Sequence, residues 1–289
     1  MQPLPSFWAH PMVRVALAIT GLGLLAFTVM RFALGQRQPP DRCPAGMIAA
    51  GARCCGAGQT LENGRCSGPA SSCAVSQDLN AEGQCVARFG VVSLPGGELF
   101  IGAADWEGQT GGERFPRTRI EPFRIDVNEV TFERYRTCAS CVPLSGESGA
   151  PVVGIQAEVA EAFCQSQRGR LPSAAEWVWA AAGAAARRYA WGQSGLVCRR
   201  AAFGLILGPC AQQGQAELAG SRPDGASPEG LLDLAGNVAE WTREPGEARF
   251  AARGGSFRST AAAELKTWAV EASGQASSPS IGFRCAYRR

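Results

Sequence analysis

Histidine is almost absent from this sequence, and paired metal-binding cysteines are scarce. The 289 residues include a single histidine, His10, and the spacing Cys-x-x-Cys occurs once, at Cys138 and Cys141. Structural zinc sites combine several paired cysteines or cysteine–histidine clusters. Zinc therefore remains only the minor alternative for the 12 cysteines of the chain, and disulfide bonds are the favoured explanation.

Blocks of positive charge are also missing. The formal net charge is +3, and the basic residues, almost all arginine, are scattered along the chain. Nucleic-acid-binding proteins gather Lys and Arg on one face or stripe, so we expect no nucleic-acid partner. The 36 glycines, in contrast, indicate many turns and little regular structure for a chain of this size.

An apolar run at residues 15–34, interrupted by Arg31, precedes every cysteine. In a helix it would reach about 30 Å, the thickness of the hydrocarbon core of a bilayer. We expect residues 1–35 to be an uncleaved transmembrane anchor; a cleaved signal peptide is the alternative. Because disulfides persist in oxidising compartments, we expect the bulk of the chain to be periplasmic or extracellular and tethered to the membrane.

Residues 36–88 contain an internal repeat of cysteine pairs with a glycine shortly before each second cysteine. This segment has too few large apolar side chains to build a hydrophobic core. We therefore expect disulfide cross-links to stabilise it instead. From spacing alone we predict the pairs Cys43–Cys54, Cys55–Cys66 and Cys73–Cys85, each closing a small bent ribbon; other connectivities of these cysteines stay open. We expect this disulfide-rich stalk to hold the main domain away from the membrane.

From residue 90 onwards the pattern is that of a mixed α and β domain. Residues 91–94 and 98–101 read as two strands around a Pro-Gly-Gly turn, and residues 123–127 alternate as a third strand. Residues 156–167 carry an apolar stripe of helical period. Ser173 and Glu176 have the spacing of a capping box at the start of another helix.

Six motifs of this region occur in an order and spacing that resemble the formylglycine-generating enzyme (sulfatase-modifying factor) family, over residues 90–289. The motifs are Gly96-Gly97-Glu98-Leu99-Phe100-Ile101-Gly102, Asn128-Glu129-Val130-Thr131, Arg170-Leu171-Pro172-Ser173-Ala174-Ala175-Glu176-Trp177, Gly236-Asn237-Val238-Ala239-Glu240-Trp241, Arg253-Gly254-Gly255-Ser256-Phe257 and Gly282-Phe283-Arg284-Cys285. The resemblance implies a compact α+β fold of the C-type-lectin-like kind with little regular structure.

The same resemblance implies disulfides and a metal. Cys164 and Cys285 match a family disulfide, which leaves Cys138 with Cys141 and Cys198 with Cys210. A family calcium site matches Asp233 and Glu240 and the backbone carbonyls of Gly236 and Val238. Calcium takes about six to eight hard oxygen ligands, which two carboxylates, two carbonyls and water can supply. The alternative is that Asp233 and Glu240 only hydrogen-bond a tight Gly-Asn turn.

The catalytic thiols of the family have no counterpart here. Catalytic members hold Cu(I) with two cysteines, and soft thiolates suit that ion. The matching positions are Ser259 and Glu264, so we expect no copper. If the resemblance holds, they line the former active-site region with Arg253, Ser256 and Arg258. Three tryptophans near these motifs are expected in the core rather than as stacking platforms for a ligand: Trp177, Trp191 and Trp241.

We therefore expect a membrane-anchored, extracytoplasmic recognition module without catalytic activity, a pseudoenzyme of its family. Its ligand would be a peptide, a protein or a glycan, by analogy alone. One alternative is an oxidoreductase of the formylglycine-generating type that modifies a cysteine of a protein. Another is a structural domain of a larger envelope assembly.

Overall fold

The computed structural model describes residues 47–50, 53–62, 65–73, 77–79, 83, 85–87, 89–101, 115–193, 195, 198–204, 210, 214–244, 250–273 and 277–289. The expected membrane anchor at residues 1–35 and the stalk cysteine Cys43 lie outside these ranges. Among the described residues, no helix combines the length and the apolar character that a membrane crossing needs.

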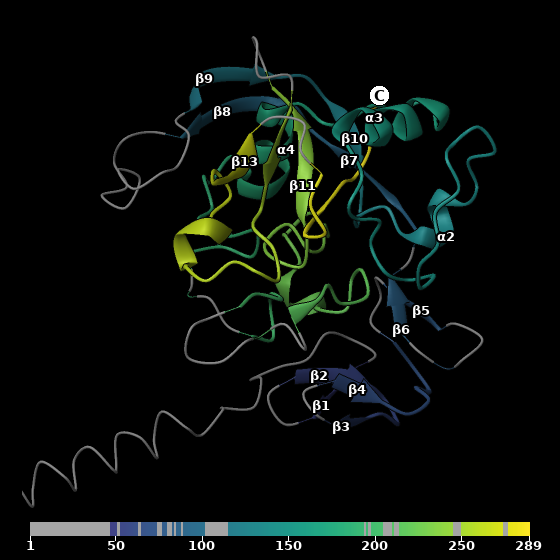
Figure 1. The fold of residues 1–289 in the computed structure, drawn as a ribbon. Helices are drawn as coiled ribbons and strands as arrows, with labels where there is room; N and C mark the ends of the chain where they lie inside the picture. Colours follow the sequence, from purple (N-terminus) through teal and green to yellow (C-terminus); the bar gives the residue numbers. More distant parts are fainter. Residues whose placement is uncertain are drawn as a thin grey trace, which may run out of the picture.

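The main domain contains two small β-sheets and a separate pair of strands (Figure 1). One sheet has the order β15-β10-β7, with β7 at Val91–Leu94, β10 at Phe123–Asp126 and β15 at Ala286–Arg288. The other has the order β13-β12-β11-β14, from β11 (Ala239–Arg243), β12 (Phe250–Arg253), β13 (Val270–Ser273) and β14 (Ile281–Gly282). Strands β8 (Gly97–Ile101) and β9 (Phe115–Ile120) pair with each other. All pairs are antiparallel except β11 with β14.

The helices are short, and the predicted capping residues begin two of them. Thr131 caps α2 (Phe132–Tyr135) by accepting from the amide of Arg134. The stripe at residues 156–167 forms α3 (Ala157–Ser166). Ser173 and Glu176 form the predicted capping box of α4 (Ala174–Ala182). Two 3₁₀ turns, η4 (Pro223–Gly225) and η5 (Ala262–Leu265), follow later in the chain.

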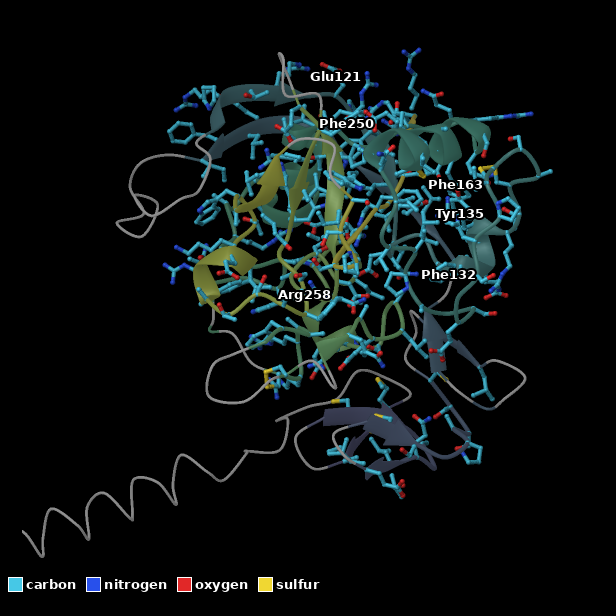
Figure 2. The ribbon with its side chains drawn as sticks, viewed as in Figure 1. Glu121, Phe132, Tyr135, Phe163, Phe250 and Arg258 are labelled. Carbon is cyan, nitrogen blue, oxygen red and sulfur yellow. A yellow bond between two sulfur atoms is a disulfide. The ribbon has the colours of Figure 1, made fainter. Side chains whose placement is uncertain are left out.

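Two apolar cores stabilise this arrangement. The first packs α4, buried on nearly every side, against apolar residues of β7, β8, β9 and β10, and it includes Trp177. The second packs α3 against β11 and the C-terminal segment, and contains Tyr135, Phe163 and Phe283. The Tyr135 and Phe163 rings stack with centroids 5.0 Å apart (Figure 2). The domain is thus a sheet-rich mixed α/β fold with few helices, and its buried aromatics compensate for the scarcity of regular structure.

The described parts of the stalk are three two-stranded hairpins, which matches the small bent ribbons expected from the cysteine repeat. They pair β1 (Met47–Ala50) with β2 (Arg53–Gly56), β3 (Thr60–Glu62) with β4 (Arg65–Ser67), and β5 (Gln77–Leu79) with β6 (Cys85–Ala87). In Figure 1 the first two hairpins lie together beside the main domain. A sulfur–oxygen contact of 3.6 Å joins Cys54 to Asp224, so the stalk touches the domain.

Four disulfides join described cysteines: Cys55–Cys66, Cys138–Cys141, Cys164–Cys285 and Cys198–Cys210. All four pairings are among those expected from spacing or from the resemblance. Cys54 and Cys73 are disulfide-bonded as well, and the pairs predicted for them involve side chains outside the described part. The Cys164–Cys285 bond spans 121 residues of sequence and ties α3 to the chain just before β15. Such a link restricts the unfolded chain far more than a short ring does.

Candidate functional site

The Gly-Gly-Ser turn after β12 forms the centre of the candidate site. Gly254 and Gly255 have φ values of +95° and +68°, a backbone conformation that glycine adopts without strain. The amide of Gly236 donates to the Gly254 carbonyl at 2.9 Å, and the amide of Phe257 donates to the Asn237 carbonyl at 2.8 Å. The turn is therefore attached by backbone hydrogen bonds to the Gly-Asn motif that begins β11.

Ser259 and Glu264, at the positions of the family thiols, are both engaged in local hydrogen bonds. The Ser256 amide donates to the Ser259 hydroxyl at 2.9 Å, and the Ser259 amide donates to the Ser256 carbonyl at 3.0 Å. The Glu264 carboxylate accepts from the Thr260 amide at 3.0 Å. Ser259 is 4% exposed, whereas Glu264 lies at the surface. These two groups act as turn-stabilising acceptors and offer no soft ligand.

Glu271 of β13 joins this site, and no sequence motif pointed to it. The hydroxyls of Ser256 and Ser280 donate to its carboxylate at 3.3 and 3.5 Å. Burial raises the pKa of Glu271, and the nearby charge of Glu264 adds to that effect, while the two serines and Arg258 oppose it. Within the described part of the chain, no lysine or arginine forms an ion pair with Glu264 or Glu271.

The two arginines expected to line the site differ in their burial and in their contacts. Arg253 is fully buried and pairs with the carboxylate of Glu244 at 3.0 Å, so it supports β12 from inside instead of facing a ligand. Arg258 is exposed, with its guanidinium 5.4 Å from the centroid of the Phe257 ring. In Figure 2 Arg258 lies in the lower half of the main domain, toward the stalk hairpins. The expected lining is thus reduced to Arg258 and Glu264 at the surface, above buried serines.

Glu240, predicted as a calcium ligand, is held by Arg284 instead. The Arg284 guanidinium donates to the two carboxylate oxygens of Glu240 at 2.6 and 2.7 Å, and the Trp177 indole nitrogen donates to Glu240 Oε2 at 2.7 Å. Glu240 and Arg284 are fully buried. The remaining Arg284 donors reach the carbonyls of Asp126, Val127 and Leu232. Glu240 is therefore an ion-pair partner of Arg284 inside the core, and its predicted role as a calcium ligand stays a prediction.

Asp233 faces a second carboxylate, Glu129, which sequence reasoning placed in a family motif but not in a site. Burial raises the pKa of Glu129 well above its usual range, and the negative charges of Asp233 and Glu240 raise it further. Burial also raises the pKa of Asp233. The Asn237 side-chain amide donates to Glu129 Oε1 at 3.0 Å, but Glu129 Oε2 accepts no hydrogen bond. Two buried acids, close enough to share a hydrogen bond, therefore lie beside the Gly-Asn turn.

The backbone positions expected to complete a calcium site are present at this turn. Gly236 has a φ of +80°, and a Cβ there would come within 2.3 Å of the Ala202 carbonyl oxygen. Val238 is fully buried at the start of β11. No cluster of three or more acidic, histidine or cysteine side chains suited to a metal occurs in the residues that the structure describes. A cation here would depend on Asp233, Glu129 and backbone carbonyls.

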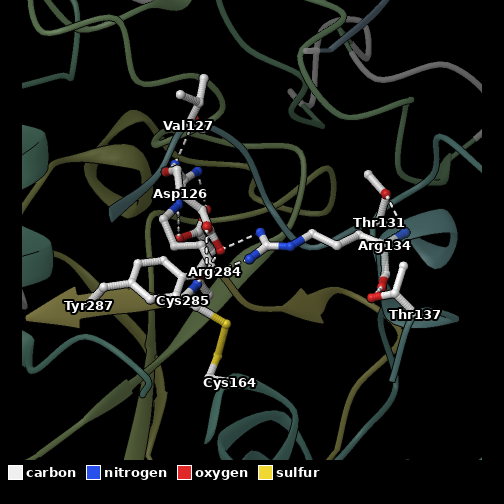
Figure 3. A network of polar contacts seen from close by, with 10 residues as sticks. Asp126, Val127, Thr131, Arg134, Thr137, Cys164, Arg284, Cys285 and Tyr287 are labelled. Carbon is white, nitrogen blue, oxygen red and sulfur yellow. Dashed lines mark hydrogen bonds and ion pairs between the residues drawn. A yellow bond between two sulfur atoms is a disulfide. The ribbon is translucent and has the colours of Figure 1, made fainter. Parts of the chain in front are cut away.

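A second polar network involves Asp126, Arg134 and Tyr287 (Figure 3). Arg134 of α2 pairs with Asp126 of β10 at 2.6 Å and donates to the Tyr287 hydroxyl. Tyr287 in turn donates to Asp126 at 3.0 Å, and the Cys285 amide donates to the same carboxylate at 2.8 Å. Burial, with the Asp126 charge, raises the pKa of Tyr287 to about 12. This network fixes α2 and the Cys164–Cys285 disulfide around the C-terminal strand.

The three tryptophans differ in their burial. Trp177 and Trp241 lie in the core as expected, at 0% and 1% exposure. Trp191 is only half-buried, because the tight Tyr189–Gly192 turn places it at the edge of its cluster. Its ring stacks on Tyr189 with centroids 5.1 Å apart, and Arg200 lies 5.8 Å from the ring centroid.

Comparisons with known proteins agree with this architecture. The model of the family described as the sulfatase-modifying factor enzyme 1-like domain matches residues 77–289. Treponema denticola variable protein 1 is similar in structure, with a TM-score of 0.58 and 17% identity over 70% of this chain and 95% of that one. PvdO from Pseudomonas aeruginosa has a TM-score of 0.56 and 18% identity over 69% and 94% of the two chains. The protein CarF has a TM-score of 0.50 and 20% identity over 70% and 99%. No curated protein sequence gives a significant match.

Proposed function

We propose that this chain, which belongs to the family of sulfatase-modifying factor enzyme 1-like domains, uses the surface around Ser256 and Glu264 to bind a ligand and not to oxidise it. The observation that carries the proposal is the chemistry of two positions. Where the resemblance places Cu(I)-binding thiols, the chain has the Ser259 hydroxyl and the Glu264 carboxylate. Neither is a soft ligand for Cu(I). No cysteine occurs between Cys210 and Cys285, so no nearby sulfur can replace them.

A positively charged peptide side chain is the ligand that the exposed groups fit best. Burial and the charge of Glu264 raise the pKa of Glu271, and the positive charge of Arg258 offsets this only in part. A lysine or arginine side chain brought by a peptide would relieve this repulsion and form charge-assisted hydrogen bonds. The hydroxyls of Ser256 and Ser280 already orient the Glu271 carboxylate.

A peptide-binding assay tests the ligand class. Fluorescence-labelled peptides of equal length, one rich in lysine and arginine and one rich in aspartate and glutamate, would be titrated with the whole protein. We expect the basic peptide to bind more tightly and Glu271→Gln to weaken it several-fold. Glu147→Gln, in an exposed loop outside the site, is the matched control. Equal binding of both peptides, or equal effects of the two variants, would contradict the proposal.

A copper assay separates binding from oxidation. We expect the natural chain to bind Cu(I) weakly and to leave a cysteine-containing peptide unchanged in oxygen. The double variant Ser259→Cys with Glu264→Cys restores the family thiols and should gain tight Cu(I) binding, which verifies the assay. Tight Cu(I) binding by the natural chain, with oxygen consumption and conversion of the peptide cysteine, would establish the alternative oxidoreductase function.

We also propose a structural calcium ion at the Gly-Asn turn, held by Asp233 and Glu129 with the carbonyls of Gly236 and Val238. The adjacent buried acids Glu129 and Asp233 support a bound cation, because uncompensated negative charge is costly in a protein interior. Glu240, the remaining expected ligand, pairs with Arg284. Calcium supplies charge neutralisation at this position, and these residues supply the oxygens.

Thermal unfolding in calcium and in chelator tests the ion. The natural chain should unfold at a higher temperature in calcium than in chelator. Glu129→Gln removes one negative charge at nearly unchanged volume, so it should abolish the difference and stabilise the protein in chelator. Glu121→Gln, at an exposed position just before β10, should leave the calcium effect intact. Identical melting of the natural chain in both solutions would exclude the ion.

Finally, we propose that the domain acts outside the cytoplasm on a membrane anchor at residues 1–35. The disulfides of the stalk and of the main domain support an oxidising compartment. Fractionation of cells that produce the full chain, followed by protease treatment of intact spheroplasts, tests the proposal. A membrane-bound, protease-accessible chain is the expected result, and a protected chain in the soluble fraction would contradict it.

A further inference from the structure

The Cys138–Cys141 disulfide lies outside the site described above, in a surface loop that follows α2. The eight residues 138–145 contain no charged side chain. Cys138 is 8% exposed, whereas Cys141 is half-buried and the two residues between them are exposed. The Cys164–Cys285 disulfide differs sharply, because both of its cysteines are fully buried. Cys141 is thus the more exposed residue of the Cys-x-x-Cys pair, and Cys138 is the more shielded one.

The backbone holds both cysteines in place independently of the sulfur–sulfur bond. The Cys138 amide donates to the Tyr135 carbonyl at 3.1 Å, and the Cys141 amide donates to the Cys138 carbonyl at 3.2 Å. Tyr135 is itself buried and stacked on Phe163. If the disulfide opens, these contacts keep the two thiols adjacent, so the bond can form again without refolding. Cys198 is also exposed, but its partner lies 12 residues away in sequence instead of three.

The surroundings of Cys138 stabilise it as a leaving thiolate. The Ser140 hydroxyl lies 3.6 Å from the Cys138 sulfur and can donate to it. A hydroxyl donor favours a thiolate over a thiol, because a hydrogen bond to the charged form stabilises that form.

We propose that Cys138–Cys141 is a thiol–disulfide exchange site that oxidises a pair of cysteine thiols on a partner polypeptide. The partner's first thiolate attacks the Cys141 sulfur; a mixed disulfide forms, the Cys138–Cys141 bond breaks, and Cys138 leaves as a thiolate. The partner's second thiolate then attacks its own first sulfur, and Cys141 leaves. The partner loses two electrons and two protons, and the Cys138 and Cys141 thiols gain them. A soluble disulfide such as oxidised glutathione returns the site to its starting state.

The apolar surface beside the reactive sulfur fits such a partner. Val142, directly after Cys141, is 65% exposed and is one of the few large apolar side chains at the surface of the described chain. An unfolded or extended polypeptide with cysteines next to apolar residues could pack against it while its thiol reaches Cys141. Val142→Ser should therefore slow exchange with such a polypeptide more than exchange with a small thiol.

Two single variants test which of the two cysteines the partner thiolate attacks. Cys138→Ser leaves the accessible Cys141 thiol and should trap a mixed disulfide with a cysteine peptide, activated as its nitropyridyl disulfide. Cys141→Ser leaves the shielded Cys138 thiol and should trap the same peptide at least ten-fold more slowly. Near-UV circular dichroism checks that both variants are folded. Equal trapping rates for the two folded variants would overturn the assigned attack on Cys141.

The natural chain provides a second test that needs no variant. The whole protein is incubated in graded mixtures of reduced and oxidised glutathione, quenched with N-ethylmaleimide and mapped by mass spectrometry. We expect Cys138 and Cys141 to be alkylated first, with unchanged circular dichroism and with Cys164–Cys285 intact. A reduced dithiol peptide should also lose one equivalent of thiol pairs per protein molecule. If Cys138–Cys141 opens only when the chain unfolds, or if the peptide stays reduced, the proposal is wrong.

Discussion

The side chain of Arg284 shows how much a single residue contributes to this domain. Its guanidinium is fully buried, and its nitrogens donate to both oxygens of Glu240 and to three backbone carbonyls. Those carbonyls belong to the end of β10 with the residue after it and to the loop before β11, so Arg284 connects its own segment to two others. A planar group with donors in a fixed fork suits this role, and lysine would not replace it.

Removal of the Arg284 guanidinium should strongly destabilise the protein. Arg284→Met leaves Glu240 charged and unpaired in the core, a change that typically costs about 3–5 kcal/mol of unfolding free energy. Urea denaturation followed by fluorescence measures it. Arg117→Met, at an exposed ion pair with Glu98, is the matched control and should leave the midpoint unchanged. Similar shifts for the two variants would show that the Arg284 network contributes little.

At the scale of elements, side-chain hydrogen bonds in the first turn of α4 determine where this helix begins. Ser173 accepts from the Glu176 amide at 3.2 Å, and Glu176 accepts from the Ser173 amide at 2.9 Å. The Arg170 guanidinium holds the same carboxylate with two contacts of 2.6 Å. Local sequence therefore starts this helix, whereas its burial on nearly every side comes from the surrounding domain.

Loss of the cap should weaken α4 without altering the fold. Ser173→Ala removes the hydroxyl that accepts from the first turn, so we expect about 1 kcal/mol lower unfolding free energy. Ser145→Ala, in the exposed loop after α2, serves as the control and should have no effect. The denaturation midpoints of the two variants are compared under the same conditions. Equal midpoints would contradict a stabilising role of the cap.

The Glu176 carboxylate makes a pH-dependent contribution to stability. Burial alone would raise its pKa, but the hydrogen bonds and charge of Arg170 and the bonds from Ser173 lower it below the usual value. Its stabilisation is therefore complete above the pKa of the unfolded chain, about 4.3, and is lost as pH falls through the folded pKa. The stability difference between the natural chain and Glu176→Gln should be clear at pH 7 and should shrink in acid. A constant difference would contradict this assignment.

At the scale of the whole molecule, the Cys164–Cys285 disulfide links two segments of the second core that are far apart in sequence. It joins α3 to the C-terminal segment across 121 residues, next to the Asp126–Arg134–Tyr287 network (Figure 3). Replacement of both cysteines by serine should cost about 4–5 kcal/mol by the chain-entropy estimate. The same change at Cys138 and Cys141 should cost about 2 kcal/mol, because that ring is short. Guanidinium denaturation compares them, and the reverse ranking would contradict the entropic explanation.

Local patterns were sufficient for much of the fold. Strand alternation at residues 123–127, the cap at Thr131 and the capping box at Ser173 depend on neighbours within a few residues, and each has its counterpart in the structure. The sequence predicted the burial of Trp191 and Arg253 less well. Their burial depends on the Tyr189–Gly192 turn and on Glu244, contacts that no local spacing specifies.

The sequence by itself determined the family, the mixed α and β architecture and the absence of thiols at residues 259 and 264, because these follow from the order of motifs and from residue identity. Only the tertiary structure decided what the charged side chains contact. It pairs Glu240 with Arg284, places Glu129 beside Asp233, and brings Glu271 within hydrogen-bonding distance of Ser256. Such pairings join residues far apart in the chain, and their free energy depends on burial and distance, which a linear pattern does not contain.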